Sequence, residues 1–292
     1  MKPLVDGVAR VLLSERDSEG RIPRFPYDKW RGAHWVLSCL ADIGYPAGDE
    51  GLIPLREQVL DWLMRADPMS SRKRMNPPRA CCSIQGNAVW YLLKLGLADE
   101  RVDELVRQML SWQWPDGGWN CDVDGTGRTS SFMESLIPLR ALALYSEIGP
   151  IGRISEGLAG SSEVKRAVGR AADVFLSRRM FRRRTDGSVI HPSFLKLHYP
   201  CYWHYDILFG QRVMAEAGFI GDERCSEALD VLESKRLPDG GWPAEAKYYQ
   251  VGTRAVAGQS LVDWGGTSKR SANPWVTAQA VEVLKAAGRR VE

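Results

Sequence analysis

Residues 113–119 read Gln-Trp-Pro-Asp-Gly-Gly-Trp and separate two apolar helical stretches. Pro115 and the paired glycines cannot continue a helix, whereas a glycine takes a positive φ without steric cost. Variants with the same spacing recur at 16–22 (RDSEGRI), 183–189 (RRTDGSV) and 236–242 (RLPDGGW). Each has a long planar donor, Gln or Arg, six residues before a Trp or an aliphatic residue. Four such glycine turns predict a repeat architecture.

A second repeating feature, or periodic mark, is a glycine directly after each short apolar helical stretch. Glycine is the expected residue just past a helix end, so each of these glycines indicates where a helix stops. They are Gly44, Gly96, Gly149, Gly218 and Gly288, and they indicate five units. Each unit is expected to contain a polar amphipathic outer helix, a glycine turn or loop, and a more apolar inner helix. The outer helices are predicted at about 3–14, 54–65, 100–113, 163–178 and 222–234, and the inner helices at about 32–44, 82–96, 131–147, 203–217 and 274–287.

Alternating outer and inner helices predict a single all-α domain over residues 1–292, namely an α/α toroid of about five helix pairs around a central cavity. The sequence shows no convincing strand pattern. The segments 179–202 and 243–273 are too long for plain connections, so we expect them to cover one mouth of the cavity.

The bulk composition is that of a soluble globular protein, with 44% hydrophobic and 26% charged residues among 292. A net charge of +3 is too small to indicate nucleic-acid binding. The sequence has no apolar stretch long enough to span a bilayer and no signal-peptide cleavage pattern, so a cytoplasmic location is expected. Six cysteines in so long a chain do not indicate a disulfide framework. The basic run Arg178, Arg179, Arg182, Arg183 and Arg184 is interpreted as a solvated helix end.

The turn at 113–119 resembles the QW motif, Q-x3-G-x-W, of squalene and oxidosqualene cyclases. The alternating helices resemble the wider group of terpenoid cyclases and protein prenyltransferase β subunits. This resemblance implies a helical toroid and chemistry on an isoprenoid substrate. The usual Asp-x-Asp-Asp acid motif is replaced by Asp122-Val123-Asp124-Gly125, and Thr129-Ser130-Ser131 stands where prenyltransferases carry Asp-x-Cys. His204 lies near the position of their zinc-binding histidine.

The N-terminal ends of the inner helices should open onto one end of the cavity, so the best site candidates lie there. Basic residues at these ends suit an anionic ligand, although pairing with neighbouring aspartates is the structural alternative. Aromatic residues could stabilise a carbocation or simply fill the core. Glu134 could also form a capping box with Ser131. The substrate-binding candidates are Arg31, His34, Trp35, Arg79, Arg128, Glu134, Tyr202, Trp203, Arg270 and Trp275.

The segment 198–206 carries two histidines, a cysteine and a carboxylate. Asp206, facing an apolar cavity, would have a raised pKa and could act as a general acid, with His204 as its partner or as a metal ligand. The alternative is that Asp206 simply orients His204 or caps the helix. A zinc site is the second possibility here, since Cys201-x2-His204 can place two ligands on one ion. Cys82, Cys121 or His34 would complete such a site.

The leading hypothesis is therefore a terpenoid cyclase-like or prenyltransferase-like enzyme that acts on a hydrophobic or anionic small molecule in an aromatic cavity. A metal-dependent hydrolase or lyase on the same scaffold is the second hypothesis. A non-catalytic module that binds a ligand or a protein is the third. A deep aromatic pocket favours an enzyme, whereas a solid centre favours the binding module.

Overall fold

A computed structural model describes residues 2–65, 77–78, 80–122, 126–152, 161–254 and 256–291. The described chain is mostly α-helical, which confirms the all-α class. The helices are α1 (Lys2–Leu12), α2 (Ala33–Asp42), α3 (Ile53–Met64), α5 (Cys82–Lys94), α6 (Arg101–Ser111), α7 (Phe132–Ile148), α8 (Ser161–Leu176), α9 (Ile207–Glu216), α10 (Ser226–Ser234) and α11 (Pro274–Ala286). Within this part of the chain, every helix is too short or too polar to span a bilayer.

Short elements complete the structure. Among the described residues, 3-10 helices lie at Glu50–Leu52, Pro192–Leu195 and Glu223–Cys225. Two strands of two residues each, β1 (Gln250–Val251) and β2 (Gln259–Ser260), pair in parallel inside the segment 243–273. The sequence did not predict this pairing, because two residues are too few to produce an alternating pattern.

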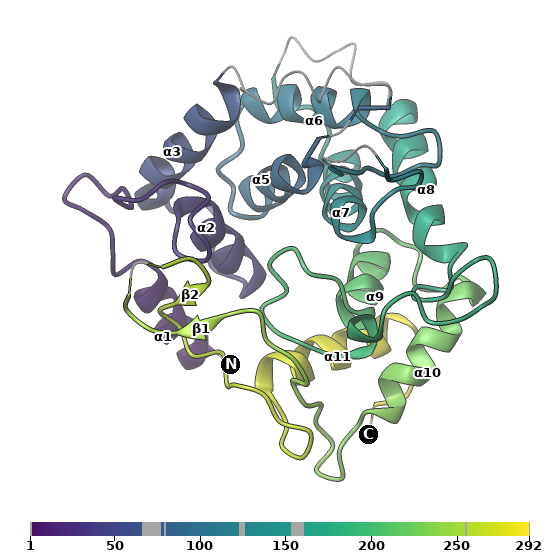
Figure 1. Ribbon diagram of the computed structural model, residues 1–292. Coiled ribbons are helices and arrows are strands. Elements are labelled where there is room, and N and C mark those ends of the chain that lie inside the picture. The colour runs from purple at the N-terminus through teal and green to yellow at the C-terminus, as the bar shows by residue number, and fades with distance from the viewer. Residues whose placement is uncertain are drawn as a thin grey trace.

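The helices form two layers (Figure 1), with α3, α6, α8 and α10 around the outside and α2, α5, α7 and α9 nearer the centre. Helix α1 packs on α2, and α11 packs on α9. Nearly all of α2, α5 and α7 is buried, whereas α6 buries one face only. This difference follows from their sequences, because exposing an apolar helix to water costs more free energy than exposing an amphipathic one.

The glycines of the four glycine turns all adopt left-handed backbone conformations, as predicted. The φ angles are 76° at Gly20, 102° at Gly117, 71° at Gly187 and 86° at Gly240. The five glycines predicted to end helices also have positive φ, from 66° at Gly96 to 87° at Gly149. The second mark therefore corresponds to real helix ends. Among the glycine turns, Gly117 and Gly240 follow α6 and α10 closely, whereas Gly187 lies in a turn between the bridged residues Arg182 and Val189.

Two of the glycine turns make the same hydrogen bonds. The indole Nε1 of Trp119 donates to the carbonyl of Met109 at 2.8 Å, and Trp242 donates to Leu232 ten residues earlier at the same distance. The backbone N–H of each tryptophan donates to a hydroxyl on the following inner helix, Ser135 on α7 or Thr277 on α11. Each tryptophan therefore joins an outer helix to the next inner helix.

The side chain of Gln113 bonds within its own turn and to the neighbouring helix α8. Its Nε2 donates to Gly117 O at 2.7 Å within its own turn and to Ala167 O on α8 at 2.9 Å. Its Oε1 accepts a hydrogen bond from Arg170, also on α8. Gln113 therefore links the end of one outer helix to the next outer helix.

Gly117→Ala is expected to destabilise the protein more than Gly187→Ala does. Both glycines are left-handed, which costs a non-glycine residue about 1–2 kcal/mol. A Cβ at Gly117 would also clash with the main-chain carbonyl of Arg170, whereas a Cβ at Gly187 meets nothing within 4 Å. Overpacking of this kind adds about 1–3 kcal/mol. Urea unfolding of the two variants measures the difference, and equal losses would contradict the close packing of this turn on α8.

The inner helices α2, α7 and α9 are joined by a central ion-pair network, defined as Asp42, Arg140, Arg212 and Glu216. Arg140, 4% exposed, contacts Glu216 through Nε at 2.5 Å and Asp42 through Nη2 at 3.3 Å. Arg212 contacts the same two carboxylates at 3.2 and 2.8 Å. The Arg140 guanidinium also stacks on Trp90 of α5 at 3.5 Å. The network therefore connects α2, α5, α7 and α9.

The space between the inner helices is largely filled. Residues 197–202 are all buried there, between α2, α5, α7 and α9. Tyr202 stacks on Trp30 with ring centroids 3.8 Å apart, and Tyr199 stacks on Trp275 at 5.4 Å. The pocket that remains beside Asn87 and Arg140 has a volume of about 20 Å³. This volume holds about one water molecule, so it does not accommodate an isoprenoid chain.

The first and last parts of the chain are also joined. The indole of Trp30 donates to Tyr248 O at 2.8 Å, and Arg31 donates to the carbonyls of Thr253 and Arg254 at 2.9 Å. The backbone N–H of Gly258 donates to Lys29 O at 2.6 Å. The segment 248–260, which contains β1 and β2, is therefore bound to the loop that precedes α2.

Candidate metal centre

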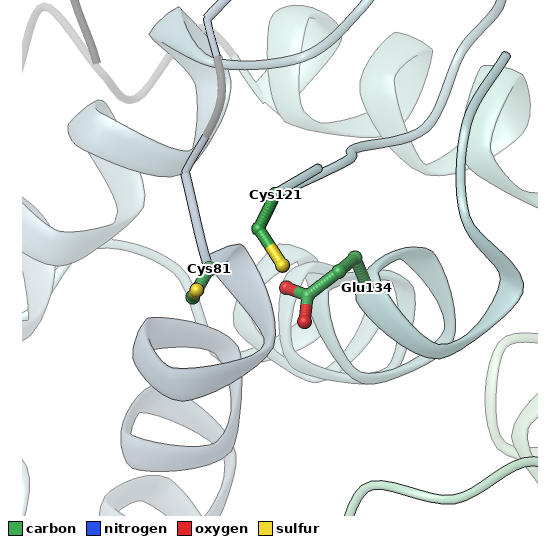
Figure 2. A group of neighbouring side chains, drawn as sticks. All are labelled: Cys81, Cys121 and Glu134. Carbon is green, nitrogen blue, oxygen red and sulfur yellow. The ribbon is translucent and has the colours of Figure 1, made fainter. Parts of the chain in front are cut away.

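Three potential metal ligands converge where α5 and α7 begin. The Sγ atoms of Cys81 and Cys121 and a carboxylate oxygen of Glu134 all lie within 4.8 Å of one another. Figure 2 shows the Cys121 thiol and the Glu134 carboxylate pointing toward each other, with Cys81 at the start of the neighbouring helix. Glu134 is buried, and the two cysteines are half-buried. The ligands come from three separate segments, so only the tertiary fold brings them together.

Close packing of α5 on α7 positions Cys81 and Glu134. A Cβ at Gly86 would lie 2.9 Å from the backbone N of Pro138, so glycine permits the two helix backbones to approach closely. Cys81 is the N-cap residue of α5. Glu134 lies in the first turn of α7, where its Oε2 accepts a hydrogen bond from Ser83 N at 3.1 Å. The carboxylate is thereby held against the start of α5.

Cys121 lies in a loop that is fixed on both sides. Asn120 donates to Thr129 O at 2.8 Å and accepts from Asp122 N at 2.8 Å. The Asp122 carboxylate in turn accepts a hydrogen bond from Gly127 N at 2.5 Å. These bonds bring residues 120–122 against the segment that leads into α7. The Cys121 thiol is therefore held beside Glu134.

Without a bound cation, the surroundings of the cluster disfavour negative charge on Glu134 and Cys121. Burial raises the pKa of Glu134 above its usual value, and hydrogen bonds from Ser83 and Cys121 offset this only in part. The pKa of the Cys121 thiol is also raised. The largest cause is a hydrogen bond with Cys81, and burial and the nearby Glu134 carboxylate contribute less. A divalent cation reverses this balance, because it favours thiolate and carboxylate over their protonated forms.

Aromatic side chains lie next to the cluster. Burial raises the pKa of the Tyr27 phenol, with further increases from Glu134, Cys81 and Cys121, so this phenol is within electrostatic reach of all three. Tyr27 packs against Trp62 with ring centroids 5.7 Å apart, and Trp62 packs edge-on against Phe25 at 5.5 Å. Phe25 is 56% exposed. The cluster therefore borders an apolar, partly accessible surface.

The donor set fits zinc best among the common metals. Two thiolates and a carboxylate are ligands that zinc accepts in tetrahedral sites, whereas calcium and magnesium require oxygen donors. Three protein ligands with one open position are typical of catalytic zinc, and structural zinc sites have four. The described residues supply three ligands.

The expected acid pair of Asp206 and His204 is not formed. The carboxylate of Asp206 accepts hydrogen bonds from Phe209 N and His198 N, both at 2.8 Å, and contacts His198 Nδ1 at 2.7 Å. Asp206 is fully buried and caps α9, so the alternative interpretation is the correct one. His204 lies before α9 rather than in its first turn, and it stacks on Tyr248 at 3.6 Å.

Several entrance candidates are structural residues instead. Arg31, 7% exposed, pairs with Glu15 and donates to two backbone carbonyls, which leaves it no role as an anion anchor. His34 is fully buried and contacts Asn87 and Tyr91. Trp35, Tyr202 and Trp275 are core residues, at most 7% exposed, and do not line an open cavity.

The remaining candidates are distributed as follows. Arg128 and Arg270 are exposed on loops, and Arg79 lies outside the described residues. Trp203 is half-buried and stacks on His204 at 4.4 Å.

Among the predicted metal ligands, Cys121 belongs to the cluster. Cys82, Cys201 and His204 do not. Cys82 is buried in the first turn of α5, and the preceding Cys81 takes its place in the cluster.

No protein-family model matches this sequence, and no curated protein matches it at a significant level. The assignment of a function therefore depends on the chemistry of the site.

Proposed function

We propose that this protein is a metal-dependent enzyme with a terpenoid cyclase-like α/α toroid, and that it acts on a hydrophobic, isoprenoid-like substrate. The observation that supports the proposal most is the convergence of Cys81, Cys121 and Glu134 at the start of two inner helices. The alternation of outer and inner helices supports the toroid, and the resemblance to prenyltransferase β subunits agrees with a zinc site at this end. The substrate would bind at the mouth of the inner helices rather than at the centre.

The residues around the cluster have distinct roles in this proposal. Cys81, Cys121 and Glu134 would hold zinc, which activates a bound thiol or water as a nucleophile. Ser83 N holds the carboxylate of Glu134 in place. Tyr27 keeps its proton, because its pKa is raised, and it can donate a hydrogen bond to a substrate oxygen. Phe25 and Trp62 would contact the apolar part of the substrate.

A metal-dependent hydrolase or lyase remains the second candidate, since the open fourth position can also hold a water molecule. Two thiolates and a carboxylate carry three negative charges against two positive charges on zinc. This excess keeps a bound thiolate nucleophilic but reduces the acidity of a bound water. The ligand set therefore favours transfer to a thiol over hydrolysis.

Elemental analysis of the purified protein is expected to find about one zinc per chain. Cys81→Ser, Cys121→Ser and Glu134→Gln should each weaken zinc binding by more than the roughly 10–100-fold that loss of an outer hydrogen-bond partner causes. Cys82→Ala and Cys201→Ala are matched controls, and both should keep the metal because neither residue belongs to the cluster.

Absence of zinc from the unaltered protein would refute the site. Loss of as much zinc from the two control variants as from the three ligand variants would refute it as well. With zinc present, the protein should transfer the prenyl group of a prenyl diphosphate to a thiol, so that a C–S bond forms, the C–O bond breaks and diphosphate is released. Release of the free alcohol instead would support the hydrolase. Zinc binding without turnover of either kind would indicate a binding module.

A further inference from the structure

A hollow with a basic rim lies on the other side of the start of α7. It has a volume of about 720 Å³ and is lined by residues 129–132 together with parts of the segment 178–194. Phe132 and Glu134 are two positions apart on α7, so their side chains leave opposite sides of the helix. The hollow is therefore separated from the metal cluster by roughly the 10 Å width of a helix. We refer to it as the arginine cleft.

Three arginines, Arg178, Arg183 and Arg184, line the arginine cleft. An adjoining hollow of about 370 Å³ shares these three and adds Arg179 and Arg182. The basic run is therefore more than the solvated helix end expected from the sequence, because α8 ends at Leu176 and the arginines surround a concave surface.

The positive charge in the cleft is poorly compensated. Within the described residues, Arg182 pairs with Glu227, whereas Arg178, Arg183 and Arg184 form no ion pair. Two carboxylates act on these arginines electrostatically without pairing with them. Asp116 acts on Arg178 and accepts hydrogen bonds from Ser130, and Asp186 acts on Arg183 and accepts hydrogen bonds from Ser188. The pKa of Arg178 is lowered, first by burial; the Asp116 carboxylate offsets this in part, and the like charge of Arg184 adds to it.

The third glycine turn, residues 183–189, leaves most side-chain donors of Arg183 available to a ligand in the cleft. In two of the other turns the long side chain at the first position donates to its own glycine, as Gln113 does to Gly117 O and Arg236 does to Gly240 O. In the first turn Arg16 donates instead to Gly51 O at 3.1 Å. In the third turn Arg182, one residue earlier, donates to Gly187 O at 3.1 Å. Within the described residues, the side chain of Arg183 makes one hydrogen bond, to Ile190 O at 3.2 Å, so its other donors can serve a ligand in the cleft.

The floor of the cleft is apolar. Phe132 and Phe194 stack with ring centroids 5.2 Å apart, and Ile190 lies beside them. Guanidinium groups match the geometry of phosphate oxygens. The volume falls within the range of small-molecule sites. We propose that the arginine cleft binds an organic phosphate, with its phosphate on Arg183 and Arg184 and its aromatic or aliphatic group on Phe132, Ile190 and Phe194.

Titration calorimetry with inorganic phosphate and phenyl phosphate tests this proposal. Both should bind, and phenyl phosphate should bind more tightly at equal charge because its ring covers the apolar floor. Arg183→Ala/Arg184→Ala should weaken both ligands roughly tenfold or more. Ile190→Ser should weaken phenyl phosphate alone. Arg166→Ala, which removes an exposed arginine of α8 outside the cleft, should change neither affinity.

The same titrations with Cys121→Ser separate this proposal from the metal site, because phosphate binding should persist without zinc. Failure of both phosphates to bind at millimolar concentration would overturn the proposal. Equal affinities in the double variant and the unaltered protein would also overturn it. Tighter binding of a DNA duplex than of phenyl phosphate would show general polyelectrolyte binding instead.

Discussion

Arg140→Met is expected to lower the free energy of unfolding by about 3–5 kcal/mol, because it leaves buried carboxylates without their partner. Arg140 is 4% exposed and contacts both Asp42 and Glu216. Without it, two carboxylates would share the single charge of Arg212. Loss of the contact with Trp90 adds to the cost. Urea unfolding followed by circular dichroism measures the change.

Arg101→Met is the matched control. Arg101 also contacts two carboxylates, Glu57 and Asp99, but its side chain is 30% exposed. Exposed pairs contribute about 0–1 kcal/mol. The double variant Arg140→Met/Glu216→Gln restores a neutral network. Its loss of unfolding free energy should therefore be smaller than the sum of the losses in the two single variants. If Arg140→Met costs no more than the control, the network does not hold the inner helices together.

Stability is expected to fall steeply as the pH drops below about 6. Burial lowers the pKa of His34 from 6.5 to about 3. Burial, with a smaller contribution from His198, lowers the pKa of His204 to about 3 as well. Both are neutral in the folded protein, so their contribution is complete above the unfolded pKa of 6.5 and is lost as the pH falls toward 3. Each histidine contributes a slope of about 1.4 kcal/mol per pH unit.

Denaturant unfolding at pH 7.5, 6.5, 5.5 and 4.5 checks this expectation. His34→Gln should remove about half of the slope whatever its effect at neutral pH, and His204→Gln should remove the other half. Glu15 and Asp42 also have lowered folded pKa values, because arginine partners outweigh the effect of burial. Their contributions are lost only as the pH falls below the usual carboxylate range, so the two effects occur in separate windows. Constant stability from pH 7.5 to 5.5 would contradict the prediction.

Most helix positions were predictable because they depend on local signals. The predicted inner helix at 131–147 is observed at Phe132–Ile148, and the outer helix at 54–65 is observed at Ile53–Met64. Apolar periodicity and a glycine at the end determine such bounds within a few residues. The inner helix predicted from 203 begins at Ile207, because Asp206 caps it and the residues before it form a loop.

The site was less predictable because its residues meet through tertiary packing. His204 and Asp206 are close in sequence, yet the carboxylate pairs with His198. The choice of Cys81 over Cys82 depends on the direction in which each side chain leaves the start of α5. Glu134 was expected to bind substrate or to form a capping box with Ser131. Its backbone N–H does donate to Ser131, but its carboxylate turns to α5. Cys121 and Glu134 lie thirteen residues apart across a loop, and no local periodicity relates them.

The bonds from Trp30 and Arg31 to the segment 248–260 have a consequence for the order of folding. They join residues more than 200 positions apart, whereas Trp119 and Trp242 bond to carbonyls only ten residues away. Local contacts form with little loss of chain entropy, and distant ones form at a greater cost. The individual helix pairs can therefore assemble early and independently, and the junction between the two ends of the chain closes late.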